Sequence, residues 1–249
     1  MPTAPSSPAG EPLPARTAAV WAALDPLIGA GTPLRVLDVG GGSGMFAVPL
    51  ARLGHDVTVV DPSADALATL RRRAETAGVG SLVRGMQGDG DLLHEVLPAA
   101  GGTADTGFDL ALCHSVLEVV DDPAVTLREI AGALRSGGQV SVATANRAGA
   151  VLARALGGHP VEALGIFQDF APGRPRAERR RFAPDDLLAL VAGAGLHSGP
   201  WRGLSVVADL LDAASGADPG AVRALELALA ETSPYRDIAT GLHLLAVRP

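Results

Sequence analysis

The sequence predicts an α/β fold built around a mainly parallel β-sheet, and three observations support this expectation. Segments with strand and helix patterns alternate along the chain, a glycine-dense turn follows the first strand, and an acidic residue ends the second. Such alternation is typical of parallel strands joined by crossover helices. A chain of 249 residues, of which 47% are hydrophobic, is sufficient for one large domain with a buried core.

The predicted elements follow one another in a regular order. A helix over residues 16–28 precedes the first strand at 34–39, and a second helix at 45–53 leads to the second strand at 57–61. The remaining predicted strands are 82–86, 108–113, 139–144, 201–206 and 242–247, and the remaining helices are 64–77, 123–134, 151–156, 184–194 and 218–231. Gly78 and Gly195 are expected to end two of these helices, and Pro184 to begin another.

The chain is expected to form one domain over residues 15–249. Residues 1–14 are rich in Pro, Ala, Ser and Gly, which predicts a disordered leader, and they lack the basic start and apolar core of a secretory signal. Residues 146–181 contain no clear strand pattern and are expected to form a lid or insertion, partly helical and partly an Arg/Pro loop. Residues 207–240 are expected to form a helical excursion before the last strand.

Composition narrows the possible partners and chemistry. The net charge of −7 does not indicate a general nucleic-acid-binding surface, and no segment approaches the ~20 apolar residues that cross a bilayer. All twenty basic residues are Arg, which excludes a lysine Schiff base or lysine general base. Because Cys113 is the single cysteine, no internal disulfide can form, which favours a cytoplasmic protein. Cys113 is expected to be a buried strand thiol rather than a nucleophile.

The glycine-dense turn predicts a nucleotide-like ligand. A ligand can lie almost against such a backbone, because glycine has no Cβ and tolerates positive φ. Asp61, at the end of the second strand, is placed to accept the hydroxyls of a ribose. An adenosine-containing cofactor is therefore expected at the carboxyl ends of the strands, where the sequence places Gly40, Gly41, Gly42, Gly44, Asp61, Asp89 and His114.

Two features distinguish between the possible adenosine cofactors. The turn has the form G-x-G-x-G and lacks the third glycine of the dinucleotide fingerprint G-x-G-x-x-G. Asp38 stands immediately before the turn, where a carboxylate suits a cationic ammonium and sulfonium better than a pyrophosphate. S-adenosylmethionine is thus the expected cofactor, and no metal site is predicted. A nicotinamide-dependent oxidoreductase and a non-catalytic cofactor-binding regulator are the alternatives from other classes.

The segment V-L-D-V-G-G-G-S-G at 36–44, together with Asp61, resembles the class I S-adenosylmethionine-dependent methyltransferases. This resemblance implies a Rossmann-like sheet of seven strands with the last strand antiparallel. It also implies that Gly40 and Gly41 lie beside the methionine moiety of the cofactor, Asp61 on its ribose and Asp89 near its adenine amino group.

Several segments resemble more specifically the family that methylates the carboxylate of 5-carboxymethoxyuridine in tRNA. These segments are 34–44, 113–120, 134–138, Asn146, Ser233-Pro234-Tyr235 and 242–249. The resemblance implies that Arg16 pairs with the cofactor carboxylate, that His114 lines the cofactor and acceptor site, and that the arginines of 174–181 meet RNA. Ala145 and Thr240-Gly241 depart from this family's pattern, so a small carboxylate metabolite remains an alternative acceptor.

The candidate site residues have competing interpretations. His114 is the candidate general base if the acceptor is a hydroxyl or an amine, whereas an ionised carboxylate needs no base. The residues expected to bind the acceptor are Asn146, Arg179, Arg180, Tyr235 and Arg236. Alternatively, Asp61 caps the helix that follows it, Asp91 replaces Asp89, and the arginines of 174–181 pair with Glu178, Asp185 and Asp186. Glu118, in a helix expected after His114, either binds the acceptor or is a capping or solvated group.

Overall fold

A seven-stranded sheet forms the centre of the molecule in the computed structural model, which describes residues 14–97, 107–168, 180–211 and 216–249. The strand order is β3-β2-β1-β4-β5-β7-β6. Strands β1 to β5 are parallel, and β7 runs antiparallel to both β5 and β6. The strands are β1 (Arg35–Val39), β2 (Asp56–Asp61), β3 (Val83–Gln87), β4 (Phe108–His114), β5 (Leu134–Ala145), β6 (His197–Leu204) and β7 (Gly241–Val247). The expected seven-stranded α/β fold with an antiparallel last strand is confirmed.

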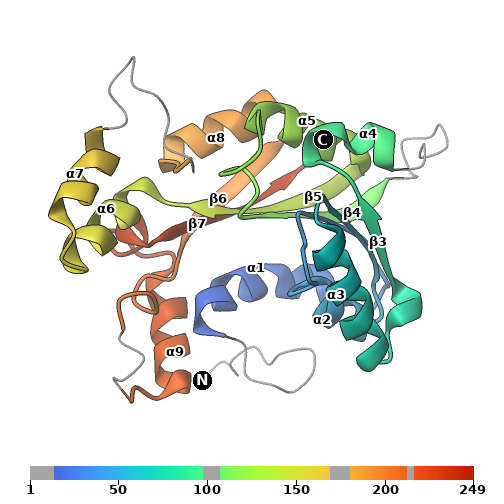
Figure 1. Ribbon diagram of the computed structural model, residues 1–249, viewed down its shortest axis with the longest axis horizontal. Helices are drawn as coiled ribbons and strands as arrows, with labels where there is room; N and C mark the ends of the chain where they lie inside the picture. The colour runs from blue at the N-terminus through green and yellow to red at the C-terminus, as the bar shows by residue number, and fades with distance from the viewer. Residues whose placement is uncertain (1–13, 98–106, 169–179, 212–215) are drawn as a thin grey trace.

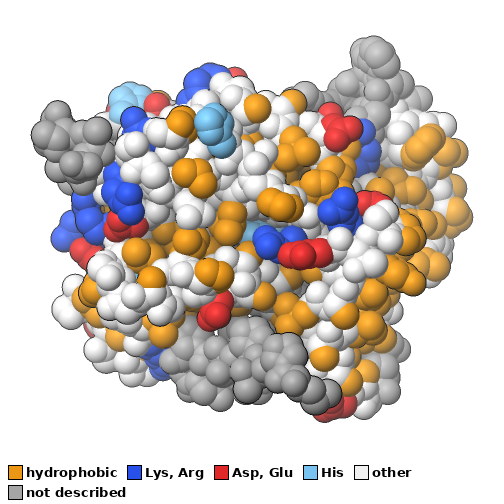
Figure 2. Space-filling view, turned by 180° about the vertical axis from the view of Figure 1, so that it is seen from behind, with side chains coloured by type: hydrophobic (Ala, Val, Ile, Leu, Met, Phe, Trp, Pro, Cys, Tyr) orange, Lys and Arg blue, Asp and Glu red, His pale blue; other side chains and the backbone are white. Residues whose placement is uncertain are grey.

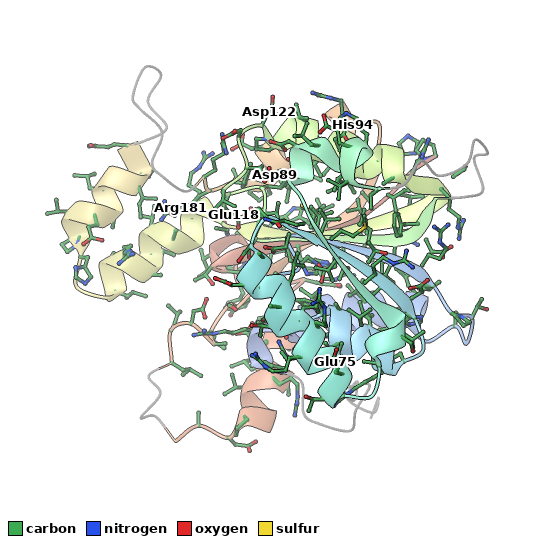
Figure 3. The ribbon with its side chains drawn as sticks, turned by 45° about the vertical axis from the view of Figure 1, so that its right-hand side comes forward. Glu75, Asp89, His94, Glu118, Asp122 and Arg181 are labelled. Carbon is green, nitrogen blue, oxygen red and sulfur yellow. The ribbon has the colours of Figure 1, made fainter. Side chains whose placement is uncertain are left out.

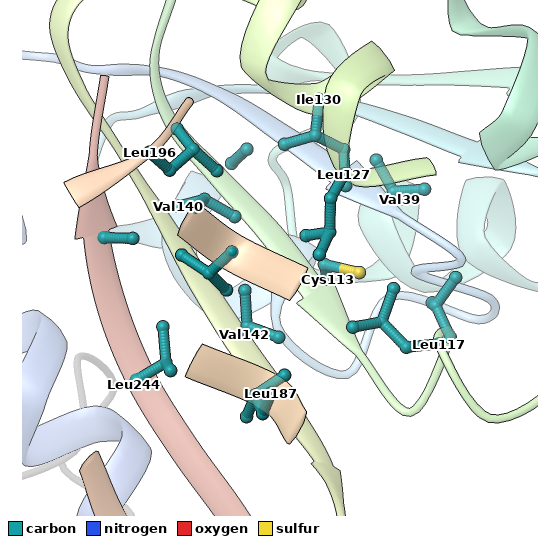
Figure 4. Close-up of a cluster of buried hydrophobic side chains, with 14 of the residues drawn as sticks. Val39, Cys113, Leu117, Leu127, Ile130, Val140, Val142, Leu187, Leu196 and Leu244 are labelled. Carbon is teal, nitrogen blue, oxygen red and sulfur yellow. The ribbon is translucent and has the colours of Figure 1, made fainter. Parts of the chain in front are cut away.

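Helices cover both faces of the sheet (Figure 1). One face carries α1 (Ala18–Ile28), α2 (Ala47–Arg52) and α3 (Ala64–Thr76), and the other carries α4 (Leu93–Val96), α5 (Pro123–Ala133) and α8 (Pro184–Gly193). Alternate residues of each strand supply the two faces, because successive side chains in a strand point to opposite sides. On the α5 and α8 side, Cys113 and Val142 pack with Leu127 and Leu187 (Figure 4).

The opposite face holds the second core cluster. There Val36, Leu110 and Leu112 pack against Trp21 of α1 and Leu50 of α2. The expected start of a helix at Pro123 is confirmed, and the side chain of Asp122 caps this helix, α5. One alternative was wrong, however, because Ser63 and not Asp61 provides the N-terminal cap of α3.

Three segments differ from the sequence expectation. Residues 115–122 form turns and not a helix after β4. Strand β5 begins at Leu134, five residues earlier than expected, because Leu134 pairs with Phe108 across a register shift. A further helix, α7 (Pro160–Gln168), lies in a stretch that was expected to be partly loop, and it packs against α6 (Arg147–Leu156).

The α6–α7 hairpin projects from one end of the sheet (Figure 1). The residues on either side of the 146–181 segment are hydrogen-bonded to each other. Phe182 N donates to Ala145 O at 2.9 Å, and Arg147 N donates to Phe182 O at 3.0 Å. Hydrophobic side chains gather on this edge of the surface (Figure 2), and the exposed ones on these two helices are Leu152, Leu156, Val161, Leu164 and Phe167. Most of the large hydrophobic side chains of α6 and α7 are therefore exposed and do not belong to the hydrophobic core.

The excursion before β7 contains α9 (Pro219–Leu229). Its buried Glu226 accepts hydrogen bonds from the backbone N–H groups of Val206, Val207 and Ala208 at 2.6–2.9 Å, which orders the loop after β6. No helix in the described part of the chain has both the length and the hydropathy to cross a bilayer.

Candidate functional site

The glycine turn connects β1 to α2 in a backbone conformation that requires glycine. Gly40 has φ +66° and Gly44 has φ +81°. A Cβ at Gly40 would collide with Val116, and a Cβ at Gly44 would collide with Leu70. The turn is fixed to the neighbouring strand, because Gly40 N donates to Val60 O at 2.7 Å. The backbone is thus exposed along a rigid bend that no larger residue can form.

Asp61 joins the end of β2 to this turn. Its Oδ2 accepts a hydrogen bond from Gly42 N, and its Oδ1 accepts one from Ser63 N, both at 2.9 Å. The side chain is 8% exposed. Each carboxylate oxygen retains a second lone pair, so the group can still accept from a ligand hydroxyl.

Asp38 is buried directly beneath the turn. It is 2% exposed, and its Oδ2 has no hydrogen-bond partner among the described residues. Burial, and secondarily the charge of Asp61, raises the pKa of Asp38 to about 7. A carboxyl in this state gains most from a cationic ligand group, which would stabilise its ionised form.

A cavity of about 430 Å³ lies at the carboxyl ends of β1, β2 and β3. Gly40, Asp61 and Asp89 line it, as does Ser115, which has a φ of +59°. Asp89 lies over these strand ends (Figure 3). Asp91 also lines the cavity, but its carboxylate accepts a hydrogen bond from Thr126 Oγ1 of α5, so Asp89 is the better candidate for ligand contact.

A hollow of about 470 Å³ lies at the opposite edge of the sheet. Arg35, Asp56 and Phe108, at the start of their strands, line it. Ligands of open α/β sheets bind beyond the carboxyl ends of the strands, and the glycine turn is there. The cavity beside the turn is therefore the candidate functional site, although it is slightly smaller than the hollow.

His114 ends β4 close to the turn. Its ring packs edge-on against Phe46, with the ring centroids 4.6 Å apart, and Phe46 follows the turn directly. Its Nε2 lies 2.8 Å from Ser141 Oγ, and its Nδ1 is buried. Burial lowers the pKa of His114 to about 4, so the ring is neutral near pH 7. The neighbouring Cys113 is fully buried, as expected, and burial raises the pKa of its thiol.

Most of the other predicted site residues contact the protein itself. Arg16 forms an ion pair with Asp209 at 2.7 Å. Asn146 is fully buried, caps α6, and donates from Nδ2 to Asp237 O at 3.0 Å and to Ala239 O at 2.7 Å. Both of its amide hydrogens are therefore used.

The described arginines of the expected acceptor region also have protein partners. The Arg180 guanidinium donates to the backbone oxygens of Val120 and Asp121, and the Arg236 guanidinium lies 4.3 Å from the ring centroid of Trp201. Tyr235 is 46% exposed. Arg174, Arg176, Glu178 and Arg179 lie outside the described residues.

Glu118 differs from two of the interpretations that the sequence offered, a helix cap and a solvated group. It is 6% exposed, so it is not solvated, and its Oε1 accepts a hydrogen bond from Ala145 N at 2.7 Å. It thereby links the loop after β4 to the end of β5. Arg180 N donates to Glu118 O at 3.0 Å, which brings the end of the 146–181 segment to the same place (Figure 3).

Sequence reasoning missed three residues near the site. Ser115 lines the cavity although its type and spacing carry no signal, and its left-handed backbone is unusual for serine. Ser141 and His243 meet beneath His114, with Ser141 Oγ 2.9 Å from His243 Nε2. Only the pairing of β5 with β7 brings these two distant residues together, so no local pattern could reveal them.

Comparisons with known proteins agree with this geometry. A family model described as a methyltransferase domain matches residues 37–142. The tRNA 5-carboxymethoxyuridine methyltransferase of Escherichia coli (strain K12) is 33% identical over 172 residues, which are 68% of this chain and 60% of that protein. The chain thus matches less than two thirds of the length of that relative.

A second relative is matched over more of its length. The ubiquinone biosynthesis O-methyltransferase of Xylella fastidiosa (strain 9a5c) is 33% identical over 196 residues, which are 75% of this chain and 72% of that protein. Among solved structures, an S-adenosylmethionine-dependent methyltransferase from Mesorhizobium loti shares the fold, with a TM-score of 0.61 and 22% identity over 92% of this chain and 98% of that one. The turn, the strand order and these matches agree, and the chain belongs to the class I S-adenosylmethionine-dependent methyltransferases.

Proposed function

We propose that this methyltransferase binds S-adenosylmethionine beside the glycine turn and methylates a carboxylate, that of 5-carboxymethoxyuridine in tRNA. The proposal combines the site geometry with the similarity to the Escherichia coli enzyme of that name. When bound, S-adenosylmethionine supplies an electrophilic methyl group on a positively charged sulfur.

The residues beside the turn fit this cofactor. The unpartnered Oδ2 of Asp38 suits a cationic group, and the bare backbone of Gly40, Gly41, Gly42 and Gly44 allows a close approach. In this proposal Asp61 accepts the ribose hydroxyls and Asp89 contacts the adenine. Arg16 would pair with the cofactor carboxylate only after leaving Asp209.

The packing of His114 against Phe46 and the burial of its Nδ1, which together lower its pKa, favour a carboxylate acceptor. A hydroxyl or an amine must lose a proton on methylation, and a histidine with a pKa of about 4 is a weak base for that step. A carboxylate is already ionised near pH 7, so the protein needs only to align it and exclude water. We therefore assign His114 to the lining of the site and not to proton removal.

We propose Arg181 and Tyr235 as the described side chains that hold the acceptor. Arg181 follows Arg180 at the end of the 146–181 segment, beside Glu118 (Figure 3), and Tyr235 is exposed. An arginine fork matches the geometry of a carboxylate or phosphate. Arg179 and Arg236 remain candidates for the same role.

A small carboxylate metabolite is the second candidate acceptor. The net charge of −7 opposes RNA, and the guanidinium groups of Arg180 and Arg236 already contact the protein. The nicotinamide alternative has no support from the turn, which lacks the third glycine.

Transfer of labelled methyl from S-adenosylmethionine tests the proposal directly. We expect label in tRNA that carries 5-carboxymethoxyuridine and none in tRNA from cells that lack this modification. Alkaline treatment should release the label, as expected for a methyl ester. Label that appears only in a small-molecule extract would establish the metabolite alternative.

The salt dependence of acceptor binding provides a second test that distinguishes tRNA from a small carboxylate. Binding of tRNA through arginine–phosphate contacts should weaken steeply between 50 and 200 mM salt, on the order of tenfold or more for a few contacts. The Michaelis constant of a small carboxylate should change much less.

A further inference from the structure

A row of side chains crosses the three neighbouring strands β4, β5 and β7. His114 of β4 is in register with Ala143 of β5, and Ala143 is in register with His243 of β7. Ser141 lies two residues before Ala143 and therefore points to the same face of the sheet. Because Ala143 is small, both imidazoles can reach the hydroxyl of Ser141.

The three polar groups form one hydrogen-bonded chain. His114 Nε2 lies 2.8 Å from Ser141 Oγ, and Ser141 Oγ lies 2.9 Å from His243 Nε2. The Nδ1 atoms of both histidines are buried without a hydrogen-bond partner in the described part of the protein. Burial lowers the pKa of both rings, which keeps both neutral.

The hydroxyl of Ser141 couples the protons of the two rings. A neutral imidazole carries one N–H and one lone pair, and a hydroxyl donates only one hydrogen bond. Apart from the two imidazoles, Ser141 Oγ has no hydrogen-bond partner in the described part of the chain, so its hydroxyl donates to one Nε2 and accepts from the other. One histidine therefore carries its proton on Nδ1 and the other carries it on Nε2.

Burial decides between the two arrangements. His243 is fully buried between β5 and β6, where an N–H on its Nδ1 would have no acceptor. His114 lies at the carboxyl end of β4, packed against Phe46 after the glycine turn, and it is only partly buried, so a ligand in the site can approach its ring but not that of His243. The N–H without a protein partner therefore belongs on His114.

We propose that His243, acting through Ser141, holds His114 as its Nδ1–H tautomer, so that His114 donates a hydrogen bond to an oxygen of the methyl acceptor. His243 and Ser141 are positioning residues in this scheme, and His114 orients the acceptor. The inference rests on the proposed carboxylate methylation, because an ionised acceptor needs a hydrogen-bond donor and not a base.

Nitrogen-15 NMR of the histidine side chains in the free protein tests the tautomer without any activity measurement. We expect His114 to carry its proton on Nδ1 and His243 on Nε2, with signals assigned by comparison with His114→Asn and His243→Gln. Ser141→Ala should release His114 into a mixture of tautomers. Thr144→Val is the matched control, because it removes a buried β5 hydroxyl on the opposite face and should leave both signals unchanged.

Kinetics of the amide variants provide a second test. The side-chain nitrogen of asparagine superimposes on histidine Nδ1, and that of glutamine superimposes on Nε2. His114→Asn should therefore retain about tenfold more kcat than His114→Gln, and Ser141→Ala should lose about tenfold without weakening S-adenosylhomocysteine binding.

A proton on Nε2 of His114 in the wild-type protein would overturn the inference. An unchanged His114 tautomer in Ser141→Ala would also overturn it, and so would a higher activity of His114→Gln than of His114→Asn. Failure of the proposed function has a different signature. In that case calorimetry would detect no S-adenosylhomocysteine binding to the wild-type protein, or no carboxylate would be methylated, whatever the NMR spectra show.

Discussion

The turn after β1 and the segment that carries α6 and α7 use their polar side chains in opposite ways. Beside the turn, Asp38 keeps a carboxylate oxygen without a partner, and Asp61 has spare lone pairs at a cavity. In the 146–181 segment, Asn146 and Arg180 direct their hydrogen bonds to backbone carbonyls of the protein.

Whether a polar side chain already has a hydrogen-bond partner in the protein distinguishes ligand-binding groups from structural groups better than residue type does. A buried polar atom without a partner is costly, and it is retained where a ligand can satisfy it. An arginine whose donors are already occupied gives little additional affinity for an acceptor. This difference supports the proposed cofactor position beside the turn and favours the accessible side chains as contacts of the acceptor.

The largest expected effect is that of Asp61→Ala on cofactor affinity. The substitution removes the acceptor of Gly42 N and the proposed ribose contact, so affinity for S-adenosylhomocysteine should fall about a hundredfold or more. Calorimetry measures this loss. Asp91→Ala, which removes a carboxylate from the same cavity, is the control and should cost only a few-fold. Unaltered affinity in Asp61→Ala would remove the ribose assignment.

Asn146→Ala tests the structural side of the comparison. It removes the cap of α6 and two hydrogen bonds to backbone carbonyls, so the free energy of unfolding should fall by about 2–3 kcal/mol. Urea denaturation measures the change, and Ser63→Ala, which removes only a cap, should cost about 1 kcal/mol. Cofactor affinity should stay the same in both variants. An acceptor defect in Asn146→Ala without lost stability would show that we have misplaced this residue.

Asp38 should make cofactor affinity depend on pH. The pKa of this carboxyl is about 7 in the folded protein, against an ordinary value of 3.8. A cationic ligand requires the ionised form, so affinity should fall about tenfold for each pH unit below 7 and level off above it.

The same shift has a consequence for stability. The folded chain holds this proton more tightly than the unfolded chain, so the contribution of Asp38 to stability is fully present below pH 3.8 and is lost as the pH rises through about 7. In Asp38→Asn both pH dependences should disappear, with affinity low throughout. A pH-independent affinity in the wild-type protein would place the cationic group elsewhere.

The smallest expected effects distinguish two adjacent arginines. Arg180→Ala should lower the free energy of unfolding by about 1–2 kcal/mol, because Val120 and Asp121 lose a charged donor. Arg181→Ala should leave stability unchanged and raise the Michaelis constant of the acceptor several-fold. Paired measurements of thermal unfolding and steady-state kinetics decide the question, and the reverse pattern would exchange the two roles.

The sequence could predict that the residues of the proposed cofactor site lie together, because the signals for this part of the fold are local. Asp38, the four glycines and Asp61 lie within two adjacent strands and the turn between them, and their spacing alone brings them together. The partners of distant side chains could not be predicted in this way. The contacts of Asn146 with Ala239, of Arg180 with Val120, and of Ser141 with His243 depend on how remote segments pack.

Cys113, the only cysteine of the chain, is fully buried between β4 and α5. A maleimide dye should therefore not react with Cys113 in the native protein and should label it once the sheet unfolds. Labelling of the wild-type chain can thus be used to follow unfolding. A cysteine introduced on α7 or in the loop before β7 would be labelled alone, and its fluorescence could follow how that part of the molecule responds when tRNA is added.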